Sequence, residues 1–186
     1  MTDVEDVSIE ALPERDDWDD QTIVAAGGGE GSSLTGTPLG VAAVEQARTQ
    51  VGVVETGTNC GIPHERYVKW IAGPAAPCAP WCAYFVGWAF DTSSAGNRDH
   101  RAPWGNSGYV PWIYDWARRS GKLVDVPVHG DVFFLNPTDS VHSHMGFVAG
   151  ADPSHHQIYT CEGNWRDRVL SQTRDYGAGD IGFARI

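Results

Sequence analysis

Between residues 37 and 120 apolar residues recur every three to four positions, and after residue 121 they form short strand-like runs. Thr37 and Pro38 are typical of a helix start, an N-cap followed by proline in the first turn. Apolar residues at helical spacing continue from there to Gly52, which predicts one helix. Further helices are predicted over residues 63–70, 81–90 and 108–120.

After residue 121 the pattern changes to short runs of β-branched and aromatic residues, which are typical of strands. Strands are predicted within residues 122–126, 131–135, 144–150, 157–163, 167–173 and 181–186. Helices thus come first and strands second. Parallel βαβ units would alternate the two, so the segregation predicts an α+β domain with an antiparallel sheet.

Charge is distributed very unevenly along the chain. Residues 1–36 hold ten of the 24 acidic residues and one of the 13 basic ones, so −9 of the net charge of −11 belongs to this segment. The segment is also rich in Gly and Ser at its end and has no apolar periodicity. We expect residues 1–36 to be an acidic, disordered leader and linker, and 37–186 to be one folded, monomeric domain. The leader is either a solubilising segment or one that a delivery or loading partner binds.

The bulk properties exclude several classes of function. A net charge of −11 argues against a nucleic-acid partner, because phosphate binding needs clustered Lys and Arg. No apolar run approaches the roughly 20 residues of a membrane-spanning helix. Residues 1–10 carry acids where a secretory signal carries bases, so we expect synthesis in the cytoplasm without a signal peptide.

Cys82 is the leading candidate for a nucleophile. It falls in the first turn of the helix predicted over 81–90, where unpaired N–H groups and the helix dipole lower the pKa of a thiol. Buried cysteine is also common in cores, and from helix position alone a structural role is the more frequent case. Position by itself therefore does not assign a function.

A nucleophilic thiol needs a base within hydrogen-bond reach, usually a histidine oriented by a third polar group. His144 begins one predicted strand, and Glu162 and Asn164 lie on the next. Neighbouring antiparallel strands can bring either side chain beside the imidazole. The His-Ser-His run at 142–144 is a weak candidate for zinc, because no third ligand stands at a recognised spacing.

These residues match a known family. The stretch APWCAYFVGWAF around Cys82 resembles the Pro-Trp-Cys-Ala-x-Phe-Val-x-Trp signature of CHAP domains, the cysteine, histidine-dependent amidohydrolases/peptidases. In the same order, HGDVFFL and SHMGFV are similar to the strands before and around the family's histidine, and YTCEGN is similar to its Glu-Gly-Asn block. The resemblance covers about residues 39–186.

The resemblance implies a papain-like α+β fold, in which N-terminal helices carry the nucleophile at a helix N-terminus that packs on an antiparallel sheet. It implies that Cys82 is the nucleophile, His144 the base and Glu162 the orienting group, with Asn164 as a second polar candidate. It also implies that the Cys82 N–H contributes to an oxyanion hole. The implied substrate is peptidoglycan of the bacterial cell wall, cleaved at the muramoyl-L-alanine amide or within the stem peptide and cross-bridge.

Other functions stay open beside this one. They are a papain-like hydrolase of a different amide, such as an NlpC-type endopeptidase or a protein-directed protease, and a catalytically silent wall-binding module. Without a signal peptide, we expect release by lysis, a holin or an injection machine, as for a phage lysin or a delivered effector, or export by another route. Some family members bind calcium through an Asp-x-Asp loop, which residues 56–67 lack, so we predict no metal and no cofactor.

Two tryptophans are candidate substrate contacts. Trp81 adjoins the nucleophile, and Trp165 stands where the family often has a small hydroxyl residue. For Cys60 and Cys78 a disulfide and two buried thiols are equally favoured. Cys161 is expected to point to the opposite face of its strand from Glu162 and to pack in the core.

Overall fold

The structure, a computed structural model, describes residues 35–177 and 180–186. Nearly all of the predicted leader, residues 1–34, lies outside the described residues. Thr35 forms an isolated bridge with His129, and the Gly36 N–H donates to the His129 carbonyl at 2.7 Å. Ordered contacts of the domain therefore include two residues before the predicted boundary at residue 37.

The helices follow local sequence signals. Helix α2 (Pro38–Arg48) begins as predicted, with the Thr37 side chain accepting a hydrogen bond from the Gly40 N–H at 3.0 Å. It ends before Gly52 because the chain turns there, and the Gly52 N–H donates to the Val169 carbonyl of strand β5 (Arg168–Asp175) at 2.9 Å. The other predicted helices are also present: η1 (His64–Val68), a π-helical turn, α3 (Lys69–Ala72), α4 (Cys82–Thr92) and α5 (Val110–Arg119).

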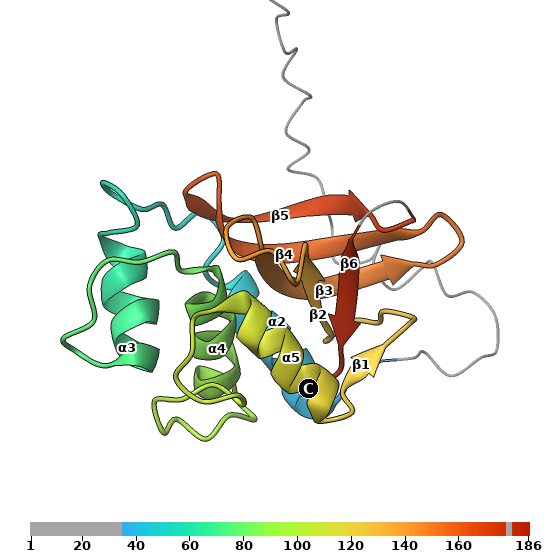
Figure 1. The fold of residues 1–186 in the computed structure, drawn as a ribbon, viewed down its shortest axis with the longest axis horizontal. Coiled ribbons are helices and arrows are strands. Elements are labelled where there is room, and N and C mark those ends of the chain that lie inside the picture. Colours follow the sequence, from blue (N-terminus) through green and yellow to red (C-terminus); the bar gives the residue numbers. More distant parts are fainter. Residues whose placement is uncertain (1–34, 178–179) are drawn as a thin grey trace, which may run out of the picture. The chain divides into compact units, whose positions relative to one another are not determined.

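All six predicted strands are present and form one sheet (Figure 1). They are β1 (Leu123–Val124), β2 (Val132–Leu135), β3 (His144–Asp152), β4 (Gln157–Trp165), β5 (Arg168–Asp175) and β6 (Ile181–Ala184). Their order is β1-β6-β2-β3-β4-β5, and every neighbouring pair is antiparallel. The α+β prediction, with helices first and an antiparallel sheet second, is therefore confirmed for the described residues.

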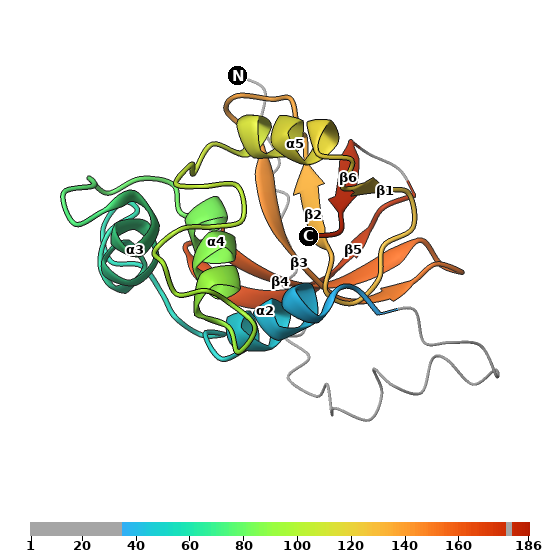
Figure 2. The ribbon, with the colours of Figure 1, turned by 90° about the horizontal axis from the view of Figure 1, so that it is seen from below.

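The two faces of the sheet bury different sets of residues. Alternate residues of β3 and β4, among them Met145, Phe147 and Cys161, join the main core, to which α2, α4 and α5 contribute (Figure 2). The opposite face carries a smaller apolar cluster of Phe133, Val148, Ile158 and Phe183. Because side chains alternate along a strand, His144 and Glu162 point to the face opposite to that of Met145 and Cys161. The expected packing role of Cys161 is confirmed.

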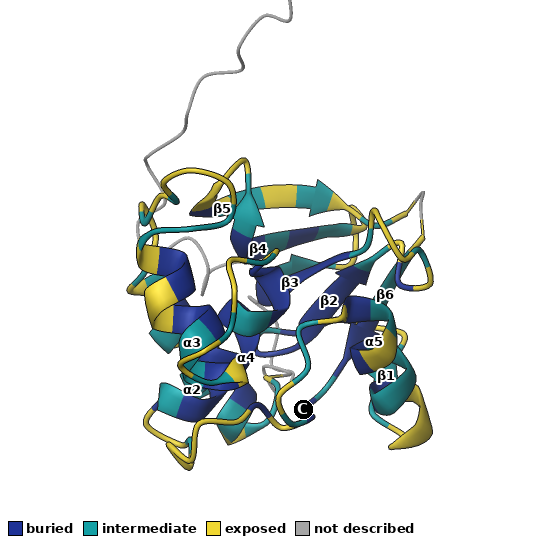
Figure 3. Cartoon of the chain, turned by 60° about the vertical axis from the view of Figure 1, so that its left-hand side comes forward, coloured by how far each residue is buried: buried dark blue, intermediate teal, exposed yellow. Residues whose placement is uncertain are grey.

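Burial decreases from the middle of the sheet to its β5 edge. Figure 3 shows β2 and β3 almost entirely buried, whereas exposed and partly buried residues alternate along β5. Strand β5 thus has one face toward solvent and one toward the protein. Among the described residues, no helix combines the length and the apolar composition needed to cross a membrane.

The loop before α4 is fixed by a disulfide. Cys60 and Cys78 are bonded, with an S–S distance of 2.01 Å and a Cα–Cα distance of 5.2 Å. This pairing resolves the two interpretations that the sequence left open. Because Cys78 is four residues before Cys82, the bond ties the segment leading into α4 to the loop that precedes η1.

Candidate active site

Cys82 is the first residue of α4, as predicted. The preceding residue, Trp81, occupies the N-cap position without capping the helix through its side chain, so N–H groups of the first turn stay available at this end. The thiol is buried and free. Burial opposes its ionisation, but a hydrogen bond and the charge of His144, with backbone N–H groups of Met145 and Ala83, outweigh burial and lower the pKa of Cys82.

His144 is the first residue of β3 and is buried. Its Nε2 lies 2.9 Å from Oε2 of Glu162, and an ionised carboxylate has no proton to give, so Nε2 donates. That bond leaves Nδ1 for Cys82. Burial opposes protonation of the imidazole, but the contacts with Cys82 and Glu162 prevail and raise the pKa of His144. The charges therefore favour a thiolate and imidazolium pair.

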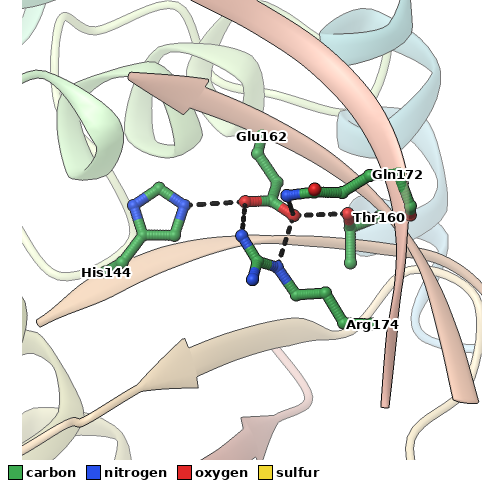
Figure 4. A network of polar contacts seen from close by, with 5 residues as sticks. All are labelled: His144, Thr160, Glu162, Gln172 and Arg174. Atoms are coloured by element: carbon green, nitrogen blue, oxygen red, sulfur yellow. Dashed lines mark hydrogen bonds and ion pairs between the residues drawn. The ribbon is translucent and has the colours of Figure 1, made fainter. Parts of the chain in front are cut away.

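Glu162 is 0% exposed on β4 and accepts hydrogen bonds from four side chains (Figure 4). Arg174 donates twice, from Nε to Oε1 at 2.7 Å and from Nη2 to Oε2 at 2.6 Å. Gln172 Nε2 donates at 2.9 Å, and the Thr160 hydroxyl donates as well. Burial opposes ionisation, but the hydrogen bonds from His144 and Arg174 prevail and lower the pKa of Glu162 to about 2.

Trp165 lies beside this network at the end of β4. Its ring centroid is 5.1 Å from that of the His144 imidazole and 4.2 Å from the guanidinium carbon of Arg174. The indole thus contacts both the proposed base and the arginine that holds Glu162. Trp165 is partly exposed, and its role as a substrate contact stays a prediction.

Two predicted site residues lie elsewhere. Trp81 is fully buried, its ring packs against Tyr67 and Phe85, and its Nε1 donates to Glu55 at 2.7 Å. This position corrects the expectation that Trp81 lines a substrate groove, because a ring enclosed by the core presents no surface to a ligand.

Asn164, the second polar candidate, turns away from the imidazole. It adopts a positive φ of 63° at the irregularity between β4 and β5, and its Nδ2 donates to Asn59 at 3.3 Å. Glu162 is the residue of the pair that meets His144.

Three residues of the network were not predicted from the sequence: Thr160, Gln172 and Arg174. Gln172 and Arg174 are two apart on β5 and so share a face, and Thr160 and Glu162 share a face of β4 in the same way. The pairing of Thr160 with Gln172 places both sets on the same side of the sheet. The sequence signal for Arg174 was a charged residue on the inward face of β5. The sequence does not identify its partner, because that depends on the register of β4 with β5.

Histidines other than His144 do not join this network. His142, His155 and His156 are exposed in turns, as expected. Within residues 35–177 and 180–186, no group of three or more His, Cys, Asp or Glu side chains is placed to hold a metal ion.

Comparisons with protein-family models, with curated proteins and with solved structures gave no match for this chain. The arrangement of Cys82, His144 and Glu162 is therefore interpreted from its own geometry. The thiol of α4 is hydrogen-bonded to the imidazole of β3, which is hydrogen-bonded to the carboxylate of β4. Their pKa shifts favour a charged thiolate and a charged imidazole held by a carboxylate.

Proposed function

We propose that this protein is a cysteine amidohydrolase with a papain-like CHAP fold, and that it cleaves an amide bond of peptidoglycan. The proposal rests on the buried hydrogen-bonded series Cys82, His144 and Glu162. In this series the thiol lies at a helix N-terminus, and the imidazole lies between the thiol and the carboxylate. A silent binding module needs no such order. The resemblance of the stretches around Cys82, His144 and Glu162 to CHAP domains supports peptidoglycan as the substrate.

In the proposed reaction the Cys82 thiolate attacks the carbonyl carbon of the amide and forms a carbon–sulfur bond. The carbonyl electron pair moves to oxygen, and its return expels the amine as the carbon–nitrogen bond breaks. The His144 imidazolium gives its proton to the leaving nitrogen, which leaves a thioester on Cys82. Neutral His144 then takes a proton from water, the hydroxide attacks the thioester, and the acid product leaves as the thiolate returns.

The first turn of α4 supplies the electrostatic part of the proposal. A carbonyl oxygen that becomes negative beside Cys82 lies at the positive end of a helix, where the Cys82 N–H is a natural donor. A preorganised donor of this kind contributes about 3 kcal/mol to transition-state stabilisation. Glu162 acts through His144, because its bond to Nε2 fixes the imidazole with Nδ1 toward the sulfur.

Mass spectrometry of fragments released from purified cell walls tests the proposal. Incubation with the full chain should release soluble fragments, and Cys82→Ala under the same conditions should release none. New L-alanine amino termini beside intact glycan strands identify an amidase, whereas shortened stem peptides or opened cross-bridges identify an endopeptidase. Intact walls together with cleavage of an unrelated protein would instead identify a protein-directed protease and contradict the proposed substrate.

A further inference from the structure

Arg174 belongs to a closed set of contacts that the sequence did not indicate. Its guanidinium donates twice to Glu162, and Glu162 accepts from Nε2 of His144. The same guanidinium lies over the indole of Trp165, and that indole contacts the imidazole. Arg174 thus reaches His144 by two paths, one polar through Glu162 and one aromatic through Trp165.

Both charged groups of the Glu162–Arg174 pair are largely removed from water. The Glu162 side chain is 0% exposed and that of Arg174 is 14% exposed. Taking such charges out of water is unfavourable unless they are paired and fully hydrogen-bonded. A bidentate guanidinium fork satisfies both oxygens of a carboxylate in one plane and so fixes its orientation as well as its charge.

We propose that Arg174 is a positioning residue for the Cys82 and His144 pair: its fork on Glu162, braced by the stack on Trp165, keeps the carboxylate charged and aimed at Nε2 of His144. The inference rests on the proposed cysteine chemistry but not on the identity of the amide that is cleaved.

The titratable groups around this carboxylate come from four elements. His144 faces it from β3 and Arg174 from β5, while Cys82 of α4 lies beyond the imidazole. On β4 itself, Cys161 adjoins Glu162 in sequence but points to the opposite face of the strand. Among the described residues, Arg174 is therefore the cation that contacts Glu162 directly besides His144.

Removal of the cation should change the pH at which Cys82 becomes reactive. Without Arg174 the buried carboxylate gains protons at a higher pH, because a nearby opposite charge no longer favours its ionised form. A protonated Glu162 is a poor acceptor for the imidazolium, and the thiolate loses its charged partner. The direct loss of a positive charge near His144 instead favours the imidazolium, which opposes this change. Arg174 contacts Glu162 and not the imidazole nitrogens, so the effect on the charge of Glu162 is the larger of the two.

The experiment measures the rate of Cys82 alkylation by iodoacetamide, a neutral reagent, between pH 3 and pH 10. The midpoint for Arg174→Gln should lie about 1 pH unit above that of the wild type. Arg174→Lys keeps the charge without the fork and should stay closer to the wild type. Arg168→Gln, an exposed arginine on the same strand, is the matched control and should leave the midpoint unchanged. Peptide mapping separates Cys82 from the buried Cys161.

An unchanged midpoint in folded Arg174→Gln, with a lower melting temperature alone, would assign Arg174 a structural role and overturn the inference. If Arg174→Gln does not fold, Trp165→Leu removes the brace and should shift the midpoint in the same direction. No shift in that variant also counts against the proposal. Because alkylation needs no substrate, a shifted midpoint in a protein that leaves cell walls intact would refute the peptidoglycan proposal while the role of Arg174 stands.

Discussion

Two buried carboxylates in this domain are each held by a bidentate arginine, and their further contacts differ. Glu162 on β4 binds Arg174, and Asp131 just before β2 binds Arg185, with distances of 2.9 Å and 2.8 Å in the second pair. Both carboxylates are 0% exposed. The remaining donors differ: Asp131 accepts from the backbone N–H of Val128, whereas Glu162 accepts from the titratable ring of His144.

Under the proposed function, the same kind of ion pair stabilises the fold at Asp131 and supports the chemistry at Glu162. Asp131 and Arg185 join the turn before β2 to the residue after β6, so that pair connects two strands and ends there. Glu162 and Arg174 connect β4 to β5 and continue through His144 to a thiol. Their arginines differ too, since the Arg185 side chain is 35% exposed and keeps more of its hydration than Arg174. Substitutions at the two sites should therefore separate stability from activity.

The largest effect is expected at the reacting groups beyond Glu162. Cys82→Ala and His144→Ala should each lower the rate of wall hydrolysis by at least about 10⁴-fold, because members of such a catalytic unit act together. Melting temperatures should stay close to the wild type for Cys82→Ala, which removes one sulfur atom. Turnover by Cys82→Ala within tenfold of the wild type would disprove the mechanism.

Glu162→Gln should lower the hydrolysis rate by about 10²-fold, less than either of those variants, because an orienting group acts only through the histidine. Initial rates on solubilised wall fragments measure this effect. Glu45→Gln, an exposed glutamate on α2, is the matched control. Asn164→Ala should also stay near the wild type, since its amide faces Asn59. An Asn164→Ala defect larger than that of Glu162→Gln would mean that Asn164 is the orienting residue.

Asp131→Asn should lower the stability of the domain and leave the hydrolysis rate unchanged. Loss of the charge leaves Arg185 without its partner and should lower the free energy of unfolding by about 2 kcal/mol, with partial solvation of Arg185 keeping the loss small. The rate per folded molecule should not change. Urea unfolding and the same hydrolysis assay measure the two quantities, with exposed Asp125→Asn as the control. A rate defect in folded Asp131→Asn would remove the distinction between the two pairs.

The smallest effect, counted per pH unit, is the dependence of stability on acid pH. The pKa of Glu162 is lowered in the folded state from 4.5 to about 2, so its stabilising contribution is complete above about pH 4.5 and is lost as the pH falls toward 2. One such group contributes at most about 1.4 kcal/mol per pH unit. Asp139 and Asp152 titrate in the same window. The difference in slope between the wild type and Glu162→Gln therefore isolates Glu162, and equal slopes would contradict its ionised state.

Local features of the chain were predictable from sequence because their causes are local. Thr37 and Pro38 start α2 through a cap and a fixed backbone angle, and the strands coincide with short runs of β-branched and aromatic residues. Cys82, His144 and Glu162 were identified as candidates because each lies in a recognisable motif on a predictable element. The meeting of His144 with Glu162 required only that β3 and β4 be neighbours, whereas Cys82 also depends on how α4 packs against β3.

Features that depend on distant partners were not predictable. Arg174 reaches Glu162 only through the register of β4 with β5, which an irregularity after Glu162 shifts. Trp81 adjoins the nucleophile in sequence, yet Tyr67 and Glu55 from earlier segments enclose its ring. The pairing of Cys60 with Cys78 depends on how close a loop brings the two Cα atoms. In each case the deciding neighbour lies in a different segment of the chain.

The order of strands in the sheet has a consequence for the newly made chain. Strand β6 inserts between β1 and β2, although both precede it by many residues. While the ribosome still holds residues 181–184, the apolar strand β2, Val132–Leu135, can pair with β3 on one side but has an open edge on the other. An open apolar edge is a template for aggregation with other chains. Emergence of β6 is therefore the step that protects β2, and a chain that stalls before it leaves this apolar edge unpaired.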